Sequence, residues 1–124
     1  MNDNVTRYES DSLSTSPYSV RNRNSELVFF DGQDPDDETI RNHGIRKQTV
    51  AALERVRAVA AEAGIDVEDL IRTTVYLTEM DHAVAVEQAY DEFFDGQRPS
   101  QTLIGVEALP NDAAVQIEAT GVNR

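Results

Sequence analysis

The stretch Gln97–Glu118, which reads QRPSQTLIGVEALPNDAAVQIE, carries the strongest signal for the fold. Two runs of strand-forming residues, Gln101–Val106 and Ala114–Ile117, flank the turn residues Leu109-Pro110-Asn111-Asp112. Proline fixes φ, and the asparagine and aspartate side chains bond to their own backbone, so the segment is predicted to form a β-hairpin.

The second run alternates between apolar and polar residues. Because successive side chains of a strand point to opposite faces, Val115 and Ile117 share one face and Gln116 and Glu118 share the other. A carboxylate is therefore expected near the end of a strand, on the face opposite the apolar pair.

These residues resemble the C-terminal signature of the RidA family, which is also called YjgF. Arg98-Pro99-Ser100-Gln101-Thr102, Leu109-Pro110 and Ile117-Glu118-Ala119 occupy the family's motif positions. The family's arginine, which binds the substrate carboxylate, is replaced by Gln101, and an uncharged amide cannot form a charge-assisted pair with a carboxylate. The resemblance extends from about Ser16 to Val122. It implies a chorismate-mutase-like fold and a homotrimer with ligand clefts between subunits.

The resemblance also implies roles for individual residues. Tyr18 would line the cleft, Asp31 would stand near its rim in place of a serine, and Leu103 would offer backbone groups to the ligand. Glu118 would orient or deprotonate a water, and together with Gln101 and Tyr18 it is expected to converge from two subunits on one pocket. Without the resemblance, Tyr18 is interpreted as a core or surface tyrosine and Glu118 as a solvated glutamate.

The remaining elements follow from periodicity and from turn residues. Apolar residues at spacings of three and four predict two helices, and runs of β-branched residues predict strands. Together they predict an α+β fold of two layers, with a β-sheet packed by two helices. We expect a flexible segment over residues 1–15 and a single RidA-like domain over 16–124. The predicted elements are strands Val5–Tyr8, Tyr18–Arg23, Leu27–Phe30 and Leu70–Leu77, a polar loop Asp34–Glu38, a helix Ile45–Ala63 ended by Gly64, and a helix Ala83–Phe94 capped by Asp81.

Composition narrows the classes of function. The 124 residues carry a net charge of −12 and contain no cysteine, which excludes thiolate chemistry and disulfides. Nucleic acid is disfavoured as a partner because binding phosphates needs clustered Lys and Arg. No apolar run nears the roughly 20 residues of a membrane span. We therefore expect a cytoplasmic chain with no membrane partner.

The resemblance leaves three functions open. The first is a cofactor-independent deaminase that hydrolyses imines or enamines, with altered substrate or reduced activity because of Gln101. The second is a small-molecule sensor that binds without turnover, and the third, an endoribonuclease or translation inhibitor, is disfavoured by charge. Arg21, Arg23 or Arg98 could supply the missing charge. No metal is expected, because His43 and His82 lack partners at metal-ligand spacing.

The acidic surface generates a prediction about salt. A charge of −12 repels itself, and salt screens that repulsion, so the midpoint of thermal unfolding should rise from low to molar sodium or potassium chloride. Such a rise would indicate adaptation to high internal salt, whereas a flat or falling midpoint would indicate an ordinary acidic protein. Thermal melts across both salts decide between the two.

Overall fold

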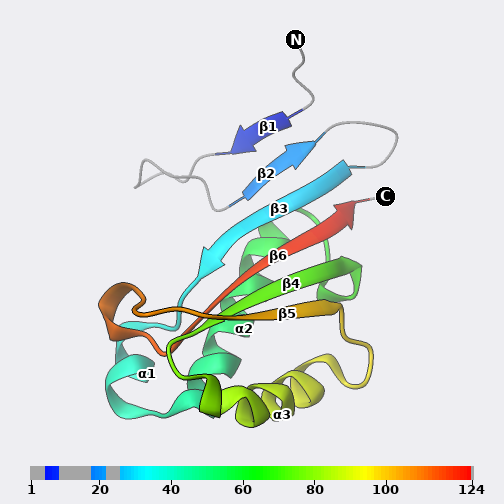
Figure 1. The fold of residues 1–124 in the computed structure, drawn as a ribbon. Helices are drawn as coiled ribbons and strands as arrows, with labels where there is room; N and C mark the ends of the chain where they lie inside the picture. The colour runs from blue at the N-terminus through cyan, green and yellow to red at the C-terminus, as the bar shows by residue number, and fades with distance from the viewer. Residues whose placement is uncertain (1–4, 9–17, 22–25, 124) are drawn as a thin grey trace.

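The computed structural model describes the backbone of residues 5–8, 18–21 and 26–123, and the side chains of residues 27–123. One layer is a six-stranded sheet with the order β1-β2-β3-β6-β4-β5, and helices form the other layer (Figure 1). Every neighbouring pair is antiparallel except β4 and β5, which are parallel. The predicted two-layer α+β fold is confirmed.

The elements are β1 (Val5–Tyr8), β2 (Tyr18–Arg21), β3 (Glu26–Gln33), α1 (Asp37–Asn42), α2 (Ile45–Glu62), β4 (Leu70–Leu77), α3 (Ala83–Phe94), β5 (Ser100–Gly105) and β6 (Val115–Asn123), with 3-10 turns at Val67–Asp69, Met80–His82 and Pro110–Asp112.

The core lies between the sheet and the helices. In β6, Val115 and Ile117 are fully buried, as their alternation predicted, and Val75 and Leu77 of β4 are buried beside them. Leu53 of α2 is also fully buried in this cluster. Alternate positions of the same strands point to the opposite face, which no helix of the described chain covers. This uncovered face of the sheet is called the open face below.

The two long helices form where the periodicity predicted them. Helix α2 begins at Ile45 and ends at Glu62, one residue before the predicted end, and Gly64 follows it with a φ of 84°. Glycine adopts that left-handed conformation without a Cβ clash, so it ends the helix. Helix α3 has the predicted bounds, but Asp81 is not its cap. His82 occupies that position because a 3-10 turn leads directly into the helix.

The predicted hairpin at Gln97–Glu118 is wrong, although both of its strands exist. Strand β5 pairs with β4 in parallel, while β6 lies between β3 and β4. Helix α3 is the crossover that a parallel β4–β5 pair requires. The turn chemistry is as predicted, since Asn111 and Asp112 have φ values of 58° and 62°, but this connection carries the chain past β4.

Two further segments differ from or extend the predictions. The polar loop predicted at Asp34–Glu38 contains the start of α1, because Asp36 caps that helix by accepting a hydrogen bond from the Thr39 N–H at 3.1 Å. Val5–Tyr8 forms the predicted strand, pairing with β2. The other residues of the predicted flexible segment 1–15 lie outside the described chain.

A buried glutamine joins α2 to the start of β6. Gln48 is only 5% exposed, and its Nε2 donates to the His43 carbonyl at 2.9 Å. Its Oε1 accepts from the Ala114 N–H, also at 2.9 Å. One side chain thus satisfies two backbone groups and fixes the entry into the strand that carries Glu118.

Replacing this side chain tests that role. Gln48→Leu keeps a similar volume but leaves both backbone groups unpaired, and each unpaired buried group costs about 1–3 kcal/mol. We expect a clear loss of the free energy of unfolding in urea. Gln88→Leu, the same change at an exposed position of α3, serves as the control and should have little effect. Equal stability of both variants would show that Gln48 does not hold β6 in place.

Candidate functional site on the open face of the sheet

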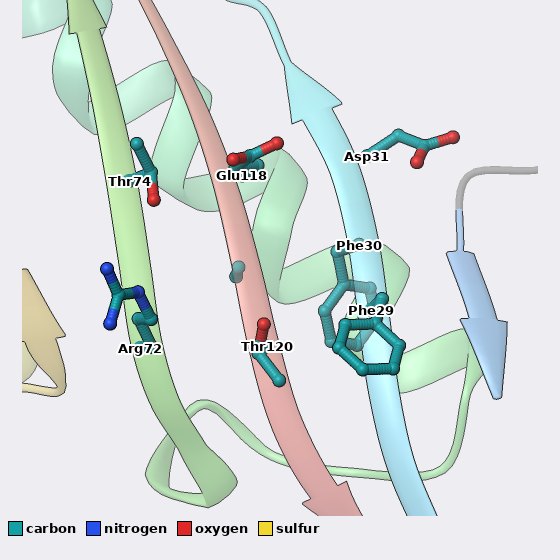
Figure 2. Close-up of a pocket in the computed structure, with 8 residues that line it drawn as sticks. Phe29, Phe30, Asp31, Arg72, Thr74, Glu118 and Thr120 are labelled. Carbon is teal, nitrogen blue, oxygen red and sulfur yellow. The ribbon is translucent and has the colours of Figure 1, made fainter. Parts of the chain in front are cut away.

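A cavity of about 210 Å³ lies on the open face, over the three central strands β3, β6 and β4 (Figure 2). Its polar groups come from strand positions that alternate with the core positions. The register explains their proximity, since Thr74 pairs with Glu118, Arg72 with Thr120 and Phe29 with Thr120. The lining residues are Phe29, Phe30, Asp31, Arg72, Thr74, Glu118, Ala119 and Thr120.

Glu118, the predicted catalytic residue, lines this cavity from the middle of the sheet. Its Oε1 accepts a hydrogen bond of 2.7 Å from the Tyr76 hydroxyl of β4. This bond raises the pKa of Tyr76, because ionisation would sacrifice it, and burial and the glutamate charge act in the same direction. The carboxylate is therefore held in one orientation with its second oxygen available to a ligand or water.

Asp31 also reaches the cavity, from an irregular part of β3. The register between β3 and β6 shifts between Phe30 and Gln33, and such a bulge re-aims the side chains it contains. Gly32 leaves room here for the Gln116 side chain, whose Oε1 would stand 2.5 Å from a Cβ at this position. Asp31 lies on the other side of Glu118 from Arg72 (Figure 2).

Gln101 and Leu103 belong to the opposite face of the sheet. They pair with Thr73 and Val75, which are fully buried, and Leu103 packs against the core. Within one chain Gln101 therefore does not meet Glu118, and the expected antiparallel pairing of their strands is wrong. Strand β5 is an edge of the described sheet, so the outer backbone groups of Leu103 have no neighbouring strand there.

Gln101 lies instead beside a cation that is already paired. Arg98 donates to Gln101 Oε1 at 3.1 Å, to Glu87 at 2.6 Å and to Asp91 at 2.7 Å. These carboxylates raise the pKa of Arg98 although burial opposes them. Arg98 could have supplied the missing charge, but two acidic residues neutralise it.

The buried hydroxyl next to Gln101 belongs to Tyr90. Burial raises the pKa of Tyr90 to about 12, against the opposing effects of Thr73 and Gln101. The Tyr90 hydroxyl donates to Thr73 Oγ1 at 3.1 Å. Gln101 Nε2 is buried beside this hydroxyl without a hydrogen-bond partner of normal geometry among the described residues.

The structure thus brings together some of the predicted residues and adds others. Asp31 and Glu118 share one cavity, whereas Gln101 and Leu103 lie elsewhere. Tyr18 begins β2 opposite Phe30, and its side chain lies outside the described part of the chain. Sequence reasoning missed the contribution of β4, whose alternation of Arg72, Thr74 and Tyr76 was the available signal.

Comparison with known proteins identifies the family. The sequence model of the family described as Endoribonuclease L-PSP matches residues 9–123. A RutC family protein of Pyrococcus horikoshii is 33% identical over 83% of this chain and 84% of that protein. The chain therefore belongs to the RidA, YjgF or L-PSP family.

Relatives with known structures or named activities extend this finding. TdcF of Escherichia coli, whose name places it among reactive intermediate deaminases, is 32% identical over 63% of each chain. The crystal structure of TdcF with bound serine has a TM-score of 0.74 at 27% identity, covering 95% of this chain and 94% of that one. An endoribonuclease homologue of Thermotoga maritima, known from its crystal structure, has a TM-score of 0.77 at 25% identity, over 100% and 99% of the two chains.

In the part of the chain that the structure describes, no cluster of three or more His, Asp or Glu side chains is suited to a metal ion. None of the described helices combines the length and apolar character needed to cross a membrane.

The hydrogen bond between Tyr76 and Glu118 can be tested by tyrosine titration. Deprotonating Tyr76 sacrifices the bond and sets two negative charges together, so this tyrosine should ionise above its usual pH of about 10. Glu118→Gln removes the charge, and the absorbance titration of one tyrosine should move to lower pH. Tyr76→Phe, which deletes that step, identifies it. Superimposable titration curves for wild type and Glu118→Gln would contradict the bond.

Proposed function

We propose that this chain is a cofactor-independent hydrolase of small imines or enamines, with Glu118 as the residue that activates water. The observation that carries the proposal is the Glu118 carboxylate, which lines a cavity of about 210 Å³ and is oriented by a 2.7 Å hydrogen bond from Tyr76. The small volume favours a ligand of a few carbons. The deaminase name of TdcF and the serine in its crystal structure support a ligand of this size and polarity.

The chemistry needs only a water and a carboxylate. Glu118 takes a proton from water as the water oxygen adds to the imine carbon, and the electrons of the C=N bond move to nitrogen, which takes up a proton. Glu118 passes that first proton to the nitrogen, which gives a tetrahedral carbinolamine. Glu118 then carries the hydroxyl proton of the carbinolamine to the nitrogen as a C=O double bond forms, the C–N bond breaks and ammonia leaves. The carboxylate returns to its starting state, so no external oxidant or cofactor is required.

The uncharged side chain of Gln101 affects which substrate the cleft would accept. We propose that three subunits associate through the open face, which exposes Phe29 and Ile104, and that each cleft joins the Glu118 cavity of one chain to the Gln101 region of another. Tyr18 and the backbone of Leu103 would line the same cleft. An uncharged amide at position 101 favours a neutral or polar group over a carboxylate at that end. Activity toward 2-imino acids is therefore expected to be low or redirected.

A non-catalytic sensor is the second candidate, and one observation favours it. Arg98, the cation that contacts Gln101 among the described residues, is neutralised by Glu87 and Asp91 and is not available to polarise an anionic substrate. Such a cleft can bind a polar metabolite without turning it over. Ribonuclease activity is disfavoured because a chain with a net charge of −12 repels a polyanion. We place the protein in the cytoplasm, with salt-adapted stability.

The experiment measures hydrolysis of 2-iminobutyrate, which is generated in the assay mixture, by following the disappearance of the imine. Light scattering on the same protein measures the mass of the assembly. Glu118→Gln should lower kcat by about a hundredfold or more, the usual contribution of a positioned acid–base group. Glu107→Gln, an equal change at an exposed residue away from the cavity, should leave kcat unchanged. Gln101→Arg should raise the rate on this substrate.

The outcomes separate the two candidates. A wild-type rate no faster than the buffer, together with saturable binding of serine, would favour the sensor. A rate that survives Glu118→Gln would remove Glu118 from the mechanism.

A further inference from the structure

We infer that Arg72 of β4 is the cation that binds the carboxylate of the ligand in the Glu118 cavity, in place of the charge that Gln101 lacks. This inference rests on the proposed function for the class of ligand, a small carboxylate. It assigns the specificity-determining residue to a different strand and to the same chain as Glu118.

The register of the sheet places Arg72 at a useful separation from Glu118. Arg72 pairs with Thr120, and Glu118 pairs with Thr74, so the two charged residues are diagonal neighbours on adjacent strands. Diagonal positions of a sheet lie about 7–8 Å apart, within reach of long side chains. Both side chains belong to the open face and line the same cavity (Figure 2). A carboxylate held by Arg72 would therefore leave the adjacent carbon of a small ligand near Glu118.

The charge of Arg72 is available to a ligand. Among the described residues no carboxylate forms an ion pair with it, and its one hydrogen bond is a long contact of 3.3 Å to Thr102 Oγ1. Arg98, the alternative cation, is held by two carboxylates. Guanidinium groups bind carboxylates through paired N–H donors, and a weak contact to a hydroxyl is easily exchanged for such a pair.

The other lining residues give the ligand a direction. Thr74 and Thr120 supply hydroxyl groups beside Arg72, while Asp31 lies on the far side of Glu118 with its carboxylate turned toward the outer edge of the cavity (Figure 2). The Arg72 end attracts an anion, and the Asp31 end repels one and favours a protonated nitrogen. An amino-acid-like or imino-acid ligand would thus lie with its carboxylate at Arg72 and its nitrogen toward Asp31.

The test compares binding of a carboxylate with binding of its uncharged methyl ester. The probes are 2-oxobutyrate and its methyl ester, and affinity is measured by NMR titration of the whole protein. Arg72→Gln should weaken binding of 2-oxobutyrate about tenfold to a hundredfold, the usual range for one charge-assisted contact, with little effect on the ester. Arg72→Lys keeps the charge and should recover part of the affinity, which also guards against a folding defect in the first variant.

Two control variants complete the design. Arg57→Gln removes an exposed cation that pairs with Glu54 and stacks on Phe93, away from the cavity, and should leave both affinities unchanged. Arg98→Gln tests the competing cation. The inference is overturned if the selective loss follows Arg98→Gln, if acid and ester weaken equally in Arg72→Gln, or if wild type does not bind 2-oxobutyrate.

The inference about Arg72 and the proposed hydrolase activity can fail independently of each other. Binding that depends on Arg72 without imine hydrolysis would support the inference while the hydrolase proposal fails. Rapid hydrolysis with an unchanged KM in Arg72→Gln would do the reverse.

Discussion

The position of β6 between β3 and β4 is the constraint on which both the core and the candidate site depend. Its inward side chains, Val115 and Ile117, are fully buried against the helices, and Glu118 and Thr120, at alternate positions, line the cavity. A slip of one residue would exchange the two sets, exposing the apolar residues and burying Glu118. The hydrophobic core therefore fixes the register that aims the carboxylate, and Gln48 fixes the point where the strand begins.

The sequence predicted the elements better than their pairing. Helices α2 and α3 and strand β4 were predicted to within a residue, because each has a long and regular apolar period. The pairing of β5 with β6 was wrong because turn residues specify only that the chain reverses. Turn residues do not indicate that a third strand, β4, lies between β5 and β6. That arrangement is decided by α3, whose crossover places β5 beside β4 in parallel, and by burial that no local pattern encodes.

The candidate site was predictable in part for the same reason. Glu118 and Asp31 were found from the family motif and from strand alternation, and both line the cavity. Arg72 and Tyr76 were missed because their contacts to β6 join residues about forty positions apart, as in the hydrogen bond from Tyr76 to Glu118. Gln101 was singled out as a departure from the family motif, but its neighbours were not predictable. Glu87 and Asp91 pair with Arg98 because α3, which carries both carboxylates, packs near the start of β5.

Charge balance gives Arg72 its significance. The chain has 23 acidic residues against 11 Lys and Arg, and among the described residues Arg46, Arg57 and Arg98 each pair with a carboxylate. An anionic ligand approaching such a surface is repelled at long range, and salt weakens this repulsion outside about 8 Å at physiological ionic strength. Binding then depends on a local cation whose charge is not already neutralised. The sheet supplies one at Arg72, whose guanidinium donates to the Thr102 hydroxyl and pairs with no carboxylate among the described residues. A loss of arginine at position 101 is thus compatible with anion binding, provided that the ligand is held from β4.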